Sequence, residues 1–103
     1  FSKIGFAATS NGLQAWRWDA PVGKQKGPLP TEYFSVKTDG KRQCYEAAIP
    51  WSELPPFKPG VDKTIGLTIA INFDRGNGRE YVRWYSGITQ GNDPSKFANL
   101  VLR

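Results

Sequence analysis

The chain has 103 residues, of which 39% are hydrophobic, and a formal net charge of +5 at pH 7. This length allows one domain at most, and it is short for a β-sandwich, which must bury two inner faces. The lysines and arginines are spread from Lys3 to Arg103 without a basic run, so we expect no nucleic-acid partner. The longest apolar runs are interrupted at every other residue, which excludes a membrane-spanning segment.

The residue types that are missing exclude several kinds of catalytic and metal site. Without histidine, neither a Ser-His-Asp triad nor a Cys-His pair can form, and the usual axial ligands of haem are absent because methionine is missing too. The single cysteine, Cys44, can make neither an internal disulfide nor a zinc site. The nine carboxylates include no pair spaced for glycoside hydrolysis. We therefore expect a protein that is not an enzyme.

Alternating apolar residues predict a series of short strands and no helix longer than a turn. In chain order, the expected strands are residues 1–8, 13–18, 33–37, 42–51 with Pro50 ending the pairing, 64–74, 79–85 and 97–102. Turns are predicted at residues 10–12, 39–40 and 77–78, where Asn, Asp and Gly favour them. Residues 21–30 show neither period and are predicted to be a loop at the rim of a binding site. This pattern favours an all-β, antiparallel β-sandwich, with a small barrel as the alternative.

Aromatic residues provide the best candidates for a functional site. Four tryptophans and four tyrosines offer flat apolar surfaces on which sugar rings stack, while polar side chains at the edges bind the hydroxyls. One predicted platform lies on the strand 13–18 and consists of Trp16 and Trp18, with Gln14 and Arg17 close by.

A second predicted platform combines Trp84 and Tyr85 with Arg83 and with Asn72 of an adjoining strand. For each tryptophan the alternative is packing in the core. Core packing is favoured for Trp51, which follows the Ile-Pro corner, whereas the two alternatives are balanced for Trp84.

The second half of the chain carries an ordered set of motifs: YEAAIPWSEL, PG, IGLTIAINFD, an arginine, Trp84 and DPSKFANLVL. Over residues 45–102 this set resembles the C-terminal part of family 9 carbohydrate-binding modules. Those modules are β-sandwiches related to DOMON-like domains, usually attached to secreted glycoside hydrolases. The resemblance implies that residues 1–103 form a single domain that is the C-terminal portion of a longer one. It also implies an incomplete sandwich, completed by missing residues or another chain, and an extracellular or periplasmic location.

The resemblance further implies a site in which a terminal sugar lies between two aromatic rings. Trp84 occupies the position of a tryptophan in the C-terminal half of such modules, and Arg17 that of a sugar-contacting arginine. Structural calcium is common in the family, and Asp74, Asn77 and Glu80 offer oxygens around one turn. The alternative for these three residues is an ordinary turn, and we assign no metal ligand.

Together, these observations predict non-catalytic carbohydrate binding that anchors an appended glycoside hydrolase to an oligosaccharide or polysaccharide. The expected protein partner is the remainder of a larger enzyme or a second chain. One alternative is a structural DOMON-like sandwich that mediates protein-protein or inter-domain packing and binds nothing small. Another is an oligonucleotide-binding barrel, which would need exposed aromatic residues interleaved with a clustered basic groove.

Overall fold

In a computed structural model the chain is built from β-strands and short 3-10 helices. No α-helix occurs in the part that the structure describes, which is residues 1–74, 76, 78–89 and 91–103, without the side chains of Phe73 and Asp74. The strands pair into small antiparallel sheets, so the predicted all-β class is confirmed. The chain divides into two compact units, Phe1–Lys58 and Pro59–Arg103, which are described separately. That residues 1–103 form one domain stays a prediction.

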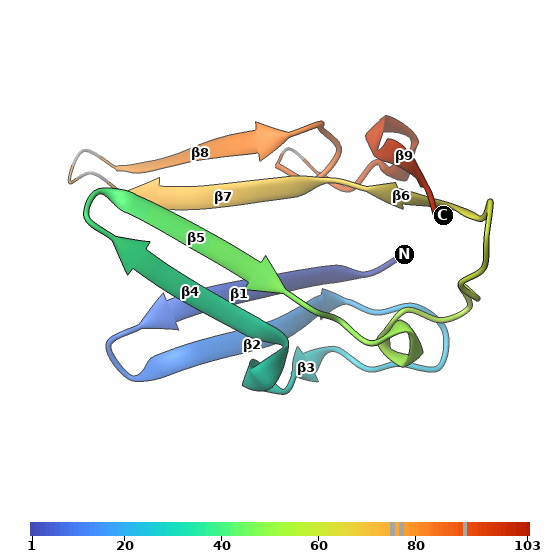
Figure 1. Ribbon diagram of the computed structural model, residues 1–103, viewed down its shortest axis with the longest axis horizontal. Coiled ribbons are helices and arrows are strands. Elements are labelled where there is room, and N and C mark those ends of the chain that lie inside the picture. The colour runs from blue at the N-terminus through green and yellow to red at the C-terminus, as the bar shows by residue number, and fades with distance from the viewer. Residues whose placement is uncertain (75, 77, 90) are drawn as a thin grey trace. The chain divides into compact units, whose positions relative to one another are not determined.

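The first unit contains a three-stranded sheet and a separate hairpin (Figure 1). The sheet has the order β1-β2-β3, with β1 at Lys3–Thr9, β2 at Gly12–Asp19 and β3 at Gly27–Pro28. The hairpin and its flanking 3-10 helices are η1 at Thr31–Tyr33, β4 at Phe34–Asp39, β5 at Arg42–Ala47 and η2 at Trp51–Glu53. Pro50 is the N-cap of η2, which confirms the predicted corner after this strand.

Aromatic stacking joins the sheet to the hairpin in the first unit. Phe6 of β1 stacks on Phe34 of β4 with ring centroids 4.6 Å apart, and Phe34 stacks in turn on Tyr45 of β5 at 6.3 Å. Ala15, which lies opposite Phe6 in β2, is buried, as is Phe34. The inner face of the sheet is therefore filled by the hairpin.

The predicted loop at residues 21–30 contains a strand that the sequence did not reveal. Gly27 and Pro28 of β3 pair with Arg17 and Trp16 of β2. A proline is tolerated there because β3 is an edge strand, whose outer N–H groups need no partner in the sheet. Two residues are too few to show any hydrophobic period, so the prediction of a continuous loop was wrong at this point.

The second unit consists of two strand pairs. β6 at Thr64–Leu67 pairs with β9 at Ala98–Val101, and β7 at Ile69–Asp74 pairs with β8 at Arg79–Trp84, while η3 occupies Pro94–Lys96. The single strand predicted over 64–74 is thus divided at Thr68, where the chain changes partner. The Thr68 hydroxyl donates a hydrogen bond to the Trp84 carbonyl at 2.8 Å. The alternation of apolar residues continues through the break, so periodicity could not show it.

Candidate functional site

Trp16 and Trp18 lie together on the outer face of β2. Their side chains are 43% and 57% exposed, and their rings are tilted by 49° with centroids 6.0 Å apart. The residues between and beside them in the strand, Ala15 and Arg17, are buried, as the period of two requires. The structure therefore brings together the two tryptophans that the sequence assigned to one platform.

The neighbouring strands present small side chains beside these rings. Trp16 pairs with Gly5 of β1 on one side and with Pro28 of β3 on the other. Trp18 is the extra residue of a β-bulge, because Lys3 pairs with Asp19 while the next residue of β1 already pairs with Arg17. A bulge re-aims the side chain that it carries.

Gly5 makes room for the indole of Trp18. A Cβ atom added at Gly5 would lie 2.8 Å from Trp18 Nε1 and 3.3 Å from Trp18 Cδ1. The shorter of these contacts is closer than real Cβ atoms show, so a side chain at Gly5 would force the indole of Trp18 to shift. The position of Trp18 thus depends on the identity of a residue in the neighbouring strand.

Polar groups follow the tryptophans along the same strand. Gln14 is exposed and shares the face of Trp16, and Asp19 comes directly after Trp18 at the end of β2. Lys26 places its ammonium 3.7 Å from the Asp19 carboxylate. The two indoles can stack on a sugar ring, and the amide, carboxylate and ammonium beside them can bind the hydroxyls of that sugar.

Arg17 does not belong to this platform, contrary to the prediction. Its side chain is 1% exposed and lies on the inner face of β2. Nη1 donates to Ser2 Oγ at 3.1 Å, and Nη2 donates to the backbone oxygen and to Oε2 of Glu53 at 2.9 Å and 3.1 Å. A guanidinium held in this way links β2 to η2 and is not available to a ligand of the outer face.

Glu53 is the centre of a small ion-pair network. Lys24 donates from Nζ to Glu53 Oε1 at 3.0 Å, while Arg17 occupies the other carboxylate oxygen. The hydrogen bond from Lys24 and the further contribution of Arg17 hold the pKa of Glu53 below its ordinary value, although partial burial raises it. The carboxylate is therefore kept ionised in the folded state, as a buried arginine requires.

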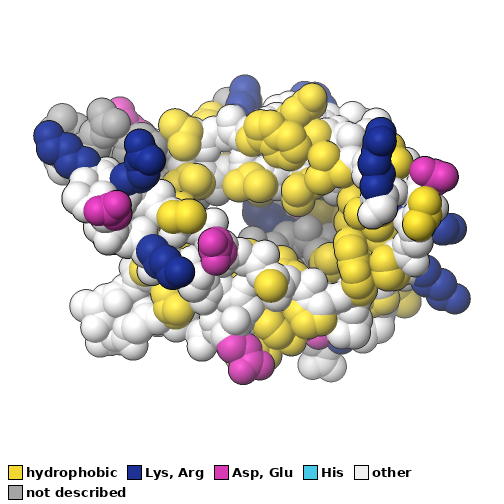
Figure 2. Space-filling model, in the orientation of Figure 1, with side chains coloured by type: hydrophobic (Ala, Val, Ile, Leu, Met, Phe, Trp, Pro, Cys, Tyr) yellow, Lys and Arg dark blue, Asp and Glu magenta, His cyan; other side chains and the backbone are white. Residues whose placement is uncertain are grey.

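The β7–β8 pair has one apolar face. Residues that pair directly in an antiparallel ladder lie on the same face, and the pairs Ile69 with Trp84 and Ile71 with Val82 share one. All four side chains are partly exposed, Trp84 by 45%, and together with Arg83 they line a shallow hollow. Figure 2 shows hydrophobic side chains gathered over β6 to β8. Trp84 is thus surrounded by aliphatic side chains, which is the environment of a packing residue.

Tyr85 follows β8 and contacts Trp84 edge to face, with ring centroids 4.9 Å apart at 76°. Its φ of 64° is in the left-handed region, which is uncommon for a residue with a side chain. The chain leaves the ladder at this residue, so Tyr85 ends β8 instead of continuing the predicted strand 79–85.

Asn72 and Arg83 alternate with the residues of the apolar face and so belong to the other face of the β7–β8 ladder. Asn72 pairs with Tyr81, and Arg83 pairs with Ala70. The structure therefore separates the second predicted platform into Trp84 with Tyr85 on one side and Asn72 with Arg83 on the other. Tyr81, which is 42% exposed and shares the face of Arg83, was not among the predicted site residues. Its alternation with Arg83 in the sequence is the signal that could have found it.

The residues considered for calcium are only partly described. Asn77 lies outside the described residues, and the side chain of Asp74 is not described. Among the described residues, no group of three or more His, Cys, Asp or Glu side chains could hold a metal ion.

A helix long and apolar enough to cross a membrane does not occur in the described part of the chain. Comparison of the chain with protein-family models, with curated proteins and with solved structures found no match.

Proposed function

We propose that the chain is a non-catalytic carbohydrate-binding module in which Trp16 and Trp18 stack on sugar rings. The observation that carries the proposal is the pair of exposed indoles 6.0 Å apart on the outer face of β2, above an inner face that is already filled. Exposed aromatic residues that the core does not need are the usual anchors of a binding surface.

The surroundings of the indoles favour a saccharide over a purely apolar ligand. Gly5 and Pro28 flank Trp16, so neither partner in the ladder covers its ring with a large aliphatic side chain. Gln14, Asp19 and Lys26 supply donors and acceptors at the edge. Sugar rings need this combination, because their C–H faces are apolar whereas their hydroxyls must be hydrogen-bonded.

The resemblance to family 9 modules supports the biological setting of the proposal. In this setting the module belongs to a carbohydrate-active enzyme that acts in an extracellular or periplasmic location. It binds an oligosaccharide or polysaccharide and thereby raises the local concentration of the appended glycoside hydrolase. Nucleic acid and membranes are not among its partners in this proposal.

The same proposal includes the β-sandwich. In it, the apolar face of β7–β8, with Ile69, Ile71, Val82 and Trp84, is an inner face, and the face with Tyr81 and Arg83 is an outer one. The alternative function, packing against a neighbouring domain or a second chain, uses the same apolar face as a docking surface. The exposure of Val82 and Trp84 supports this docking function.

Titration of the protein with oligosaccharides from glucans and xylans tests the binding function. We expect amide resonances of β1 and β2 to shift and tryptophan fluorescence to change, and Trp16→Ala or Trp18→Ala to weaken binding by at least about tenfold. Trp84→Ala is the matched control, because it removes an indole of similar exposure from the other unit. A full panel without any shift, or binding lost only in Trp84→Ala, would contradict the proposal.

Val82→Lys separates the sandwich from the docking surface. If the apolar face is internal to the fold, a buried lysine lowers the free energy of unfolding by about 2 kcal/mol or more. If the face docks another polypeptide, the unfolding free energy stays within about 0.5 kcal/mol of the original and only association is lost. Urea unfolding together with sedimentation velocity distinguishes the two outcomes.

A further inference from the structure

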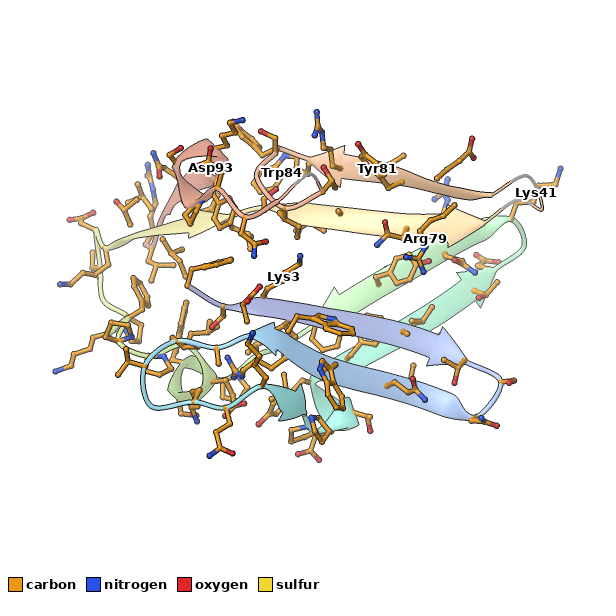
Figure 3. All side chains as sticks on the ribbon, turned by 180° about the vertical axis from the view of Figure 1, so that it is seen from behind. Lys3, Lys41, Arg79, Tyr81, Trp84 and Asp93 are labelled. Carbon is orange, nitrogen blue, oxygen red and sulfur yellow. The ribbon has the colours of Figure 1, made fainter. Side chains whose placement is uncertain are left out.

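The polar face of β7–β8 brings an aromatic ring, an amide and a guanidinium together. Tyr81 lies opposite Asn72, and Arg83 lies opposite Ala70, so the four side chains share the face that Trp84 does not occupy. Tyr81 and Trp84 are both on β8 (Figure 3). This arrangement is separate from the tryptophan pair of β2 and belongs to the second unit.

Arg83 is held in place by the loop that follows β8. Its Nη1 donates to Thr89 Oγ1 at 3.2 Å. A guanidinium has five N–H donors, and this bond uses one of them. Arg83 belongs to none of the ion pairs that the described part of the structure shows for Arg17, Lys24, Lys26 and Lys96. The charge of Arg83 is thus oriented by a neutral hydroxyl, which does not neutralise it.

The residue beside Arg83 in the neighbouring strand is small. Ala70, its partner across the ladder, has only a methyl group as its side chain. Tyr81 is two residues away, about 7 Å along the strand, and is 42% exposed. A ring stacked on Tyr81 can therefore place a carboxylate at Arg83 and a hydroxyl at Asn72.

We propose that this face binds an acidic sugar, with Arg83 pairing the carboxylate, Tyr81 stacking on the ring and Asn72 binding a hydroxyl. A carboxylate is the natural partner because its two oxygens match the planar fork of arginine. The inference goes beyond the proposed function, since it adds a second site with a charged ligand and does not depend on Trp16 or Trp18.

The test uses trigalacturonic acid and its methyl ester as probes in amide-resonance titrations of the whole chain. We expect the free acid to shift resonances of β7 and β8, and the uncharged ester to bind at least about tenfold more weakly. Arg83→Gln should lose binding to a similar extent, and Arg83→Lys should recover part of it, because it keeps the charge but not the fork. Tyr81→Ala should weaken both probes.

Arg42→Gln is the matched control, because it removes an exposed arginine from β5 in the other unit. We expect it to leave the affinity for the free acid unchanged. Equal affinity for acid and ester, equal losses in Arg42→Gln and Arg83→Gln, or shifts confined to β1 and β2 would each overturn the second site. None of these results bears on whether a neutral oligosaccharide binds the tryptophan pair.

Discussion

Trp16 and Trp84 have almost the same exposure but different surroundings. Trp16 is 43% exposed and pairs with Gly5 and Pro28, whereas Trp84 is 45% exposed and shares its face with Ile69, Ile71 and Val82. Behind Trp16, the inner face of β2 is filled by a buried arginine and by aromatic stacking. Exposure alone therefore does not identify a binding residue. A binding residue is distinguished from a packing residue by its neighbours on the same face and by the side chains that fill the opposite face of its strand.

The largest expected effect comes from disrupting the ion pair between Arg17 and Glu53, on the face of β2 opposite the tryptophan pair. Glu53→Ala leaves the guanidinium of Arg17, which is 1% exposed, without its carboxylate. Removing one partner of a buried ion pair typically costs about 3 kcal/mol or more, and we expect a loss of about 3 kcal/mol in the unfolding free energy of the first unit. Urea unfolding measures it. Glu46→Ala, at an exposed site on β5, is the control and should change stability by less than about 0.5 kcal/mol.

The next effect concerns the position of Trp18. Gly5→Ala introduces a Cβ that would lie 2.8 Å from Trp18 Nε1, so the indole has to move. If the geometry of the pair binds the sugar, affinity should fall by up to about tenfold while the fold persists. Gly60→Ala is the matched control, because its new Cβ would meet only the Lys63 side chain, at 3.4 Å. Unchanged affinity in Gly5→Ala would mean that Trp18 is not a stacking residue.

A smaller effect is expected at the end of β8. Thr68→Val keeps the shape of the side chain but removes the hydrogen bond to the Trp84 carbonyl. The expected loss in the unfolding free energy of the second unit is about 1 kcal/mol. Binding of a saccharide to β2 should not change, and a loss of that binding would contradict the assignment of the two tryptophans to different roles.

Local periodicity explains what the sequence could predict. The strands with clear alternation, such as β1, β2 and β8, were predicted within a few residues, and so was the shared face of Trp16 and Trp18, whose exposure the sequence left open. The change of partner at Thr68 depends on which strand pairs with each half, and the alternation does not record this. The burial of Arg17 depends on Glu53, which is 36 residues away in the chain. Long-range partners of this kind leave no periodic signal.

The last effect we predict is a pH dependence of the first unit. The pKa of Glu53 is lower in the folded state than its ordinary value, chiefly through the hydrogen bond from Lys24. The stabilisation by this carboxylate is therefore fully present above the ordinary pKa of glutamate and is lost as the pH falls through the lower, folded-state pKa. Urea unfolding of the original protein and of Glu53→Gln over a pH series isolates this contribution. The difference between the two should shrink as the medium becomes more acidic, because protonated glutamic acid and glutamine are both neutral. A difference that stays constant would show that the carboxylate charge does not stabilise the inner face of β2, and the contrast between the surroundings of Trp16 and Trp84 would then rest on packing alone.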